Sequence, residues 1–293
     1  MEFLKALEGR ILTLDGAMGT ELIAKGVKGA LELCNVESPE MVEAVHCAYL
    51  EAGADIITTN TTCADALCLE QYGLKSRSYE LALAGAKLAR QAADKYSTAE
   101  RRRYVAGSVG PTSRNFTLAN DIKREDVEAA YTDVIRGLID GGVDVILIET
   151  ATDSANVTVA VEEVRKQNSE IPIIVSAVLA RMEGRVASGA TIAKFLEQIP
   201  LDEVSVVGFN CTNGVKPLES ALTALAAATR KPIIAYPSVG QPPMPMTRYV
   251  KDMEQLCRAG LLNIAGGCCG TTPAHIAGIA KAAARWRGYK FDK

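Results

Sequence analysis

The sequence predicts an α/β protein with a (β/α)8 barrel, or TIM-barrel, fold. Eight short apolar segments alternate with segments of helical periodicity along the 293 residues. Because these segments are continuously apolar rather than alternating with polar residues, they indicate parallel strands covered on both faces. Eight strand–helix units in a chain of this length are typical of one barrel, and a doubly wound open sheet is the alternative.

The predicted strands cover residues 11–14, 55–60, 104–109, 144–148, 171–178, 204–209, 232–236 and 261–265. Apolar spacing predicts helices over 4–10, 39–53, 124–141, 156–168, 191–199, 217–229, 246–260 and 273–287, and helical material with a break near Gly73 that runs to about residue 96. Thr272-Pro273 opens the last helix, because threonine caps a helix and proline suits its first position. Residues 26–39 show little periodicity and are expected to form a loop.

Composition and charge exclude several classes of protein. Apolar residues make up 48% of the chain and charged residues 23%, and the net charge is only −3. No basic stripe suggests nucleic-acid binding, and the arginines at 101–103 are expected to form a solvated loop. No apolar stretch approaches the roughly 20 residues that span a bilayer. We therefore expect no membrane partner, a cytoplasmic location and, since no linker divides residues 1–293, one domain.

The eight cysteines are an unusual feature, and they stand at positions 34, 47, 63, 68, 211, 257, 268 and 269. A disulfide framework is not expected in a chain of this length without a signal peptide. Cys47 and Cys257 fall in predicted helices and are expected to be small buried core residues. Cys63 follows the second strand, where it lies either near the site or on the rim without a role.

Polar residues and thiols gather where the predicted strands end, at Asp15, Asn60, Glu149, Asn210, Cys211, Cys268 and Cys269. In a barrel of parallel strands these ends meet on one rim, which carries the active site. We therefore expect residues far apart in sequence to converge there.

Three thiolates from two strand ends suit a tetrahedral Zn²⁺ with one position left open. Soft sulfur ligands favour zinc over magnesium or calcium. The glycines around Cys268 and Cys269 are expected to let both sulfurs turn toward one ion. A vicinal disulfide, a redox pair or buried thiols are the alternatives.

A zinc ion held by three thiolates suits a thiol substrate as its fourth ligand, because metal binding deprotonates the thiol. Asp15 and Glu149 are expected to pair with a cationic group such as an α-ammonium, or else to be structural rim residues. Backbone N–H groups of residues 16–19 can hold a carboxylate. No general base is needed, and His46 is expected to be a satisfied helix residue.

At these motifs the sequence resembles the homocysteine S-methyltransferase family. The matching stretches include Asp-Gly-Ala-Met-Gly-Thr at 15–20, Gly-Phe-Asn-Cys at 208–211 and Gly-Gly-Cys-Cys-Gly-Thr-Thr-Pro at 266–273. The closest likeness is to the N-terminal homocysteine-binding barrel of cobalamin-dependent methionine synthase.

The resemblance implies zinc on Cys211, Cys268 and Cys269, with homocysteine sulfur as the added ligand and methionine as the product. It implies that the substrate is bound by Asp15, Gly16, Ala17, Met18, Glu149 and Asn210, with no catalytic residue beyond the zinc site. The implied methyl donor is methylcobalamin or a corrinoid protein. S-methylmethionine, S-adenosylmethionine and betaine are alternative donors, and a non-catalytic thiol- or zinc-binding barrel is the alternative function.

Two departures from the family pattern loosen the substrate assignment. Thr62-Cys63 stands where the family usually has an aromatic residue. Ser238 stands where the methionine synthases usually have an asparagine that can serve as a zinc ligand when substrate is absent. A different thiol therefore remains an alternative, and the resting fourth zinc ligand is open.

Overall fold

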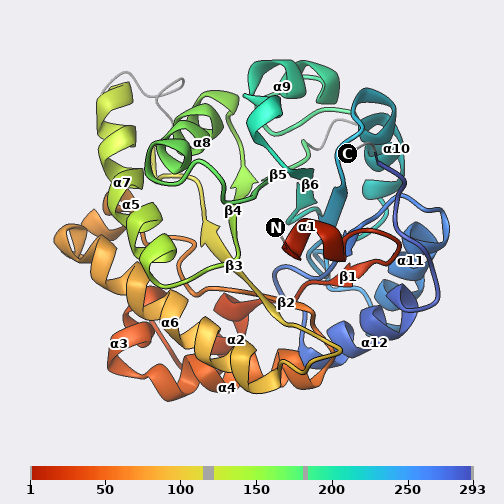
Figure 1. Ribbon diagram of the computed structural model, residues 1–293, viewed down its shortest axis with the longest axis horizontal. Coiled ribbons are helices and arrows are strands. Elements are labelled where there is room, and N and C mark those ends of the chain that lie inside the picture. The colour runs from red at the N-terminus through yellow and green to blue at the C-terminus, as the bar shows by residue number, and fades with distance from the viewer. Residues whose placement is uncertain (1, 115–121, 181–183, 292–293) are drawn as a thin grey trace.

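The computed structural model describes residues 2–114, 122–180 and 184–291, and within them eight parallel strands form the expected ring (Figure 1). The strands are β1 (Leu12–Thr13), β2 (Ile56–Thr58), β3 (Tyr104–Val109), β4 (Val145–Ala151), β5 (Ile173–Ala177), β6 (Val206–Asn210), β7 (Ile233–Tyr236) and β8 (Ile264–Ala265). They pair in the order β1-β8-β7-β6-β5-β4-β3-β2. A parallel bridge between Leu14 and Ile56 joins β1 to β2 and closes the ring, so the barrel prediction is confirmed and the open sheet is wrong.

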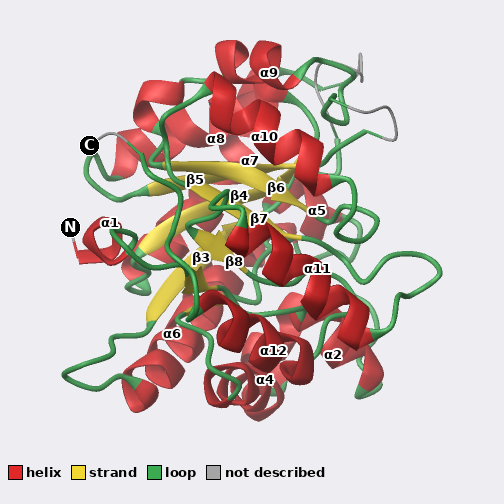
Figure 2. Cartoon of the chain, turned by 90° about the vertical axis from the view of Figure 1, so that its right-hand side faces the viewer, coloured by secondary structure: helices red, strands yellow, loops and turns green. Residues whose placement is uncertain are grey.

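Helices surround the strands on the outside (Figure 2). The longer ones are α2 (Met18–Ala24), α4 (Pro39–Glu51), α6 (Ser78–Tyr96), α7 (Arg124–Asp140), α8 (Ser154–Gln167), α9 (Ile192–Gln198), α10 (Leu218–Ala228), α11 (Met246–Arg258) and α12 (Pro273–Ala283). Shorter elements are α1 (Glu2–Ala6), α3 (Cys34–Glu37), α5 (Ala66–Glu70) and the 3-10 turns at Leu31–Leu33, Lys75–Arg77 and Leu201–Glu203. The predicted loop over 26–39 is wrong in part, because two short helical turns too brief to show a period lie within it.

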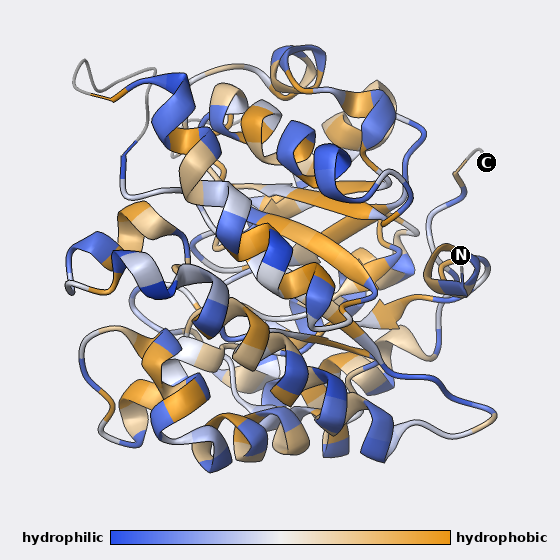
Figure 3. Ribbon diagram, turned by 60° about the vertical axis from the view of Figure 1, so that its left-hand side comes forward, coloured by the Kyte–Doolittle hydropathy of each residue, from blue (hydrophilic) through white to orange (hydrophobic). Residues whose placement is uncertain are grey.

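Two apolar layers hold the barrel together. The interior contains one inward-facing set from the strands, including Leu12, Ile56, Val145, Ile174, Val206 and Ile264. The outward-facing strand residues pack against the apolar faces of the helices, whose outer faces are hydrophilic (Figure 3). This burial on both faces explains the continuously apolar strands in the sequence.

The N-terminal end of the barrel is closed by α1 and by ion pairs. Phe3 packs on Tyr104 with ring centroids 5.5 Å apart. Buried Asp55 accepts from Arg101 at 2.9 Å and from Arg10 at 3.3 Å. The arginines at 101–103 form a loop, as expected, but the expectation that they are solvated is wrong in part. Arg103 is buried, and all three form ion pairs with aspartates at the starts of β2 and β4. None of the helices in the described ranges is both long and apolar enough to cross a membrane.

Candidate active site and metal centre

A cavity of about 300 Å³ opens at the C-terminal ends of the strands, and we call it the cysteine cavity. Eight of the nine sequence-predicted site residues line it: Asp15, Gly16, Ala17, Met18, Glu149, Cys211, Cys268 and Cys269. Asn210 lies directly behind it, fully buried. The ring of strands thus brings together residues from β1, β4, β6 and β8.

The three cysteines form one cluster in which all Sγ atoms lie within 4.8 Å of one another. The Sγ of Cys269 lies 3.7 Å from that of Cys211 and 3.9 Å from that of Cys268. A tetrahedral zinc with Zn–S bonds of about 2.3 Å places its sulfurs about 3.8 Å apart. Cys211 and Cys268 are closer and form a disulfide, with Cα atoms 5.6 Å apart. The adjacent residues Cys268 and Cys269 do not form a disulfide with each other.

The backbone near the cysteines adopts unusual conformations. Cys211 has a φ of 50° and Thr150 has a φ of 56°, in the left-handed region that few residues other than glycine adopt. Such residues gather at functional sites, where surrounding contacts hold them. Thr150 directly follows Glu149, and Cys211 directly follows Asn210. The left-handed backbone at these two positions therefore sets the direction in which the chain leaves each strand end.

Gly266 and Gly267 make room rather than supply a left-handed turn. A Cβ on Gly267 would lie 2.5 Å from the Thr271 hydroxyl, and one on Gly266 would lie 2.6 Å from Leu14. Only Gly270 of this segment has a positive φ, at 79°. Close packing against Leu14 and Thr271 therefore explains glycine at 266 and 267, and the expectation that these glycines let both sulfurs turn toward one ion stays a prediction.

Asn210 ties the strand ends together. Its Oδ1 accepts from Thr150 N at 3.0 Å and from the Ser176 hydroxyl at 2.8 Å. Its Nδ2 donates to the Thr150 hydroxyl at 2.9 Å and to Cys268 Sγ at 3.9 Å. These bonds hold the strained Thr150 and orient one cluster sulfur. Sequence patterns alone do not reveal the contacts of Ser176 and Thr150 with Asn210, because these contacts depend on which strands are neighbours.

Asp15 is buried at the end of β1 beside β2. Its Oδ2 accepts from Thr58 N at 2.7 Å, and its Oδ1 accepts from the Thr58 hydroxyl at 3.1 Å. Burial raises the pKa of this carboxyl well above its ordinary value, and the charge of Glu149 adds to the increase. No ion pair involves Asp15 among the described residues.

Glu149 extends into the same cavity from a register shift in β4 between Ile148 and Ala151. Its carboxylate accepts from the hydroxyls of Ser108, Tyr236 (3.1 Å) and Thr62 (3.4 Å). Burial raises its pKa, although these hydrogen bonds act in the opposite direction. No basic side chain lines the described cavity, so no cationic side chain of the described residues offsets the carboxyl groups of Asp15 and Glu149.

The turn at 16–18 leads from β1 into α2. No side chain caps α2, whose first turn borders the cavity. Ala17 N donates to the Thr271 hydroxyl at 3.3 Å, and Tyr49 supports the turn by donating to Ala17 O at 3.1 Å. The positive end of the dipole of α2 therefore borders a cavity whose lining also includes the carboxyl groups of Asp15 and Glu149.

Comparison with known proteins identifies the family. The sequence matches the profile of the family described as homocysteine S-methyltransferase over residues 12–283. The chain belongs to the homocysteine S-methyltransferase family. It is therefore a methyltransferase of a family whose substrate is homocysteine.

Solved structures agree with this assignment. The homocysteine methyltransferase MmuM from Escherichia coli in its oxidized form has a TM-score of 0.79 and 28% identity, covering 92% of this chain and 95% of that chain. Its metallated form has a TM-score of 0.76 and 28% identity, covering 93% and 96%. PbGH5A, a glycoside hydrolase family 5 enzyme from Prevotella bryantii, has 13% identity and a TM-score of 0.57 over 96% of this chain and 97% of that chain, and shares the fold alone.

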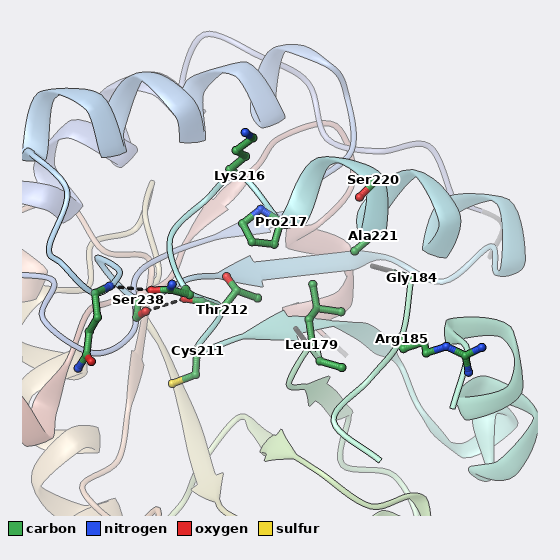
Figure 4. Close-up of a pocket in the computed structure, with 13 residues that line it drawn as sticks. Leu179, Gly184, Arg185, Cys211, Thr212, Lys216, Pro217, Ser220, Ala221 and Ser238 are labelled. Atoms are coloured by element: carbon green, nitrogen blue, oxygen red, sulfur yellow. Dashed lines mark hydrogen bonds between the residues drawn. The ribbon is translucent and has the colours of Figure 1, made fainter. Parts of the chain in front are cut away.

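The structure also locates the residues at which this methyltransferase departs from the family pattern. Cys63 lines the cysteine cavity, and its N–H donates to buried Glu32 at 3.0 Å. Glu32, which the sequence placed in a loop, is a third carboxylate of the cavity. The Ser238 hydroxyl donates to Thr212 O at 2.6 Å, close to Cys211 (Figure 4).

Two helix residues differ from expectation. Neither ring nitrogen of the fully buried His46 has a hydrogen-bond partner, so its description as a satisfied residue is wrong. Cys257 is buried as expected, whereas Cys47 is only half-buried. Apolar spacing shows which helix face is covered but not which polar partners lie beneath it.

Proposed function

We propose that this chain methylates homocysteine to methionine, with the substrate sulfur held as a thiolate on zinc and the methyl group supplied by methylcobalamin or a corrinoid protein. One observation carries the proposal: three converging cysteine sulfurs share a cavity with two buried carboxylates that have no cationic partner. A thiol that also carries an ammonium group complements both features.

The donor set fits zinc. Cys211, Cys268 and Cys269 would hold the ion, since two of the sulfur separations already match those of a tetrahedral thiolate site. Bound there, zinc lowers the pKa of a ligating thiol and keeps its sulfur nucleophilic near neutral pH. The Cys211–Cys268 disulfide is the alternative, oxidised state of the same ligands. The reaction therefore needs reduced thiols, and we place it in the cytoplasm.

The chain's own residues would bind and orient the substrate. Asp15 and Glu149 face the α-ammonium, which returns positive charge to two carboxylates that burial has destabilised. The turn of Gly16, Ala17 and Met18 faces the α-carboxylate at the start of α2. Asn210 fixes the direction of Cys268 from behind.

The chemical step is a transfer of a methyl group between a corrinoid cobalt and sulfur. The substrate thiol loses its proton to solvent on binding. With a corrinoid donor, the substrate sulfur would supply the electron pair of the new S–C bond, and the donor would keep the electron pair of its bond to the methyl group. Methionine is a neutral thioether, a weaker ligand than a thiolate, and is released.

Metal content and homocysteine binding test the proposal. Freshly reduced protein is expected to bind about one zinc per chain, and Cys211→Ser or Cys268→Ser to abolish binding, whereas Cys47→Ser retains it. Homocysteine is expected to release protons from the zinc-loaded protein in weakly buffered solution. The reduced wild type is then supplied with methylcobalamin, and methionine is quantified. Absence of zinc, or homocysteine binding without methionine from any donor, would contradict the proposal.

A further inference from the structure

A second and larger cavity, of about 830 Å³, has Cys211 of the cysteine cluster in its lining (Figure 4). It lies among the segments that follow β5, β6 and β7 and the first turn of α10, and we call it the β6–α10 cavity. Among the described lining residues, Cys211 alone borders both cavities. A molecule in the β6–α10 cavity would therefore reach the cluster at Cys211.

The two cavities carry opposite charge. The cysteine cavity contains the carboxylates of Asp15, Glu32 and Glu149 and no basic side chain among its described lining residues. The β6–α10 cavity contains Lys216 and Arg185, and its described lining includes no carboxylate. Cys211 of the cluster thus lies between a cavity that favours a cation and a cavity that favours an anion.

The start of α10 adds to the positive potential of the second cavity. The helix begins after Pro217, and no side chain caps its N-terminus. Lys216, Pro217 and Ser220 of this turn line the cavity, so the positive end of the helix dipole borders it. Lys216 is exposed and forms no ion pair among the described residues, which leaves its ammonium group available to a ligand.

The cationic groups lie away from the reactive cluster. Figure 4 shows Cys211 at one side of the cavity, with Lys216 beyond Thr212 and Pro217 and Arg185 beyond Leu179. Arg185 is held in the following loop, where it donates to Gly189 O at 2.6 Å. A ligand that spans this space would present one end to Cys211 and an anionic group at a distance from it.

We propose that the β6–α10 cavity binds the anionic portion of the methyl donor, with Lys216 as its main electrostatic contact. This inference rests on the proposed function, because it assigns the second substrate of the same reaction. For a corrinoid donor the anion is the phosphodiester of the nucleotide tail. The carboxylates of a reduced methylfolate share this chemistry.

Two corrinoid donors test the inference, because methylcobinamide lacks the nucleotide tail and its phosphate, whereas methylcobalamin has both. We expect Lys216→Glu to lower kcat/KM for methylcobalamin about 10-fold and to leave kcat/KM for methylcobinamide unchanged. The loss is expected to shrink at high ionic strength, since salt screens an exposed charge. Lys5→Glu, on α1 at the opposite end of the barrel, makes the same charge change as a control.

Direct binding provides a second readout. Retention of methylcobalamin and of 5-methyltetrahydrofolate by zinc-loaded protein is measured by equilibrium dialysis, and homocysteine binding is measured separately by proton release. If Lys216→Glu loses binding of methylcobalamin alone, the phosphodiester is supported as the bound anion. If the variant loses binding of 5-methyltetrahydrofolate alone, the folate carboxylates are supported instead. Equal loss for both corrinoids, or no loss of any ligand in Lys216→Glu, would overturn the inference. Normal homocysteine binding in the same variant shows that the proposed substrate site stands regardless.

Discussion

Asp15 and Glu149 are acidic residues that folding removes from water without providing a positive partner among the described side chains. Each is held by hydrogen bonds that fix its direction but do not cancel the cost of burying its charge. The pKa of each is raised for that reason. A ligand with an ammonium group offsets the cost of burying these charges, so the two carboxylates should contribute favourably to the binding of a cation.

Glu149→Gln is expected to raise KM for homocysteine about 10- to 100-fold, because a charge-assisted hydrogen bond contributes about 1.5–3 kcal/mol. The folded state should be no less stable, since the substitution removes a buried charge. Steady-state kinetics and urea unfolding measure the two effects. The exposed Glu170→Gln serves as the matched control. An unchanged KM would mean that Glu149 does not face the substrate.

His46 is a buried base without a hydrogen-bond partner for either ring nitrogen. Burial lowers its pKa to about 4, so the folded protein keeps the ring neutral where the unfolded chain protonates it. The unfolded state therefore binds more protons between its ordinary value, 6.5, and about 4. Stability from this group is present above pH 6.5 and is lost as the pH falls through that window.

We expect His46→Leu to remove this acid-side loss. The unfolding free energy of the wild type should fall by about 3 kcal/mol more than that of the variant between pH 7 and pH 4, at 1.36 kcal/mol for each pKa unit. Urea unfolding of reduced, zinc-free protein across this range measures the difference. Parallel pH profiles for the two proteins would show that His46 does not titrate in the assumed way.

At the scale of elements, the two ends of the barrel divide stability from function. The N-terminal end holds aspartates that tie the starts of strands to arginines, as Asp55 does with Arg10, Arg101 and Thr13 N. The C-terminal end holds the strained turns and unpaired carboxylates of the site. The ion pairs at the N-terminal end support the geometry of the C-terminal end, because the same strand register sets the positions of both.

Asp55→Asn is expected to lower the unfolding free energy by about 2 kcal/mol, because its partner arginines are half-exposed and keep part of their hydration. KM for homocysteine should not change, since the residue lies at the far end of β2 from the cavity. Denaturant unfolding and kinetics on the same preparation check both statements. Asp133→Asn, in an exposed pair with Arg136, should cost less than about 0.5 kcal/mol.

At the scale of the whole molecule, the cysteine cluster links the ends of β6 and β8. Cys211 and Cys268 are 57 positions apart in sequence. Because β7 lies between the two strands in the sheet, their thiols come together only when β6, β7 and β8 pair in this order. Metal binding should therefore stabilise the folded state as a unit, since the unfolded chain offers no such site.

Zinc at 1,000 times its dissociation constant is expected to add about 4 kcal/mol to the unfolding free energy of reduced wild type. The gain should disappear in Cys268→Ser and on addition of a chelator. Urea unfolding with a phosphine reductant, which does not supply competing thiols, measures it. An equal zinc effect in wild type and Cys268→Ser would place the ion elsewhere.

The sequence by itself determined the barrel and the family, and it pointed to the rim on which the candidate site lies. Continuous apolar strands at regular spacing report burial on two faces, and polar residues stand out where such strands end. Asp15, Glu149 and the three cysteines were visible for this reason.

Tertiary structure alone decided the contacts made across strands. The partners of Asn210, the entry of Glu32 into the cavity, the unpaired His46 and the paired arginines at 101–103 all depend on neighbours distant in sequence. The opposite charges of the two cavities also emerged only there, because each cavity collects side chains from several loops. Local patterns record which face of an element is buried, whereas the identity of the groups that meet there is set by the closure of the ring.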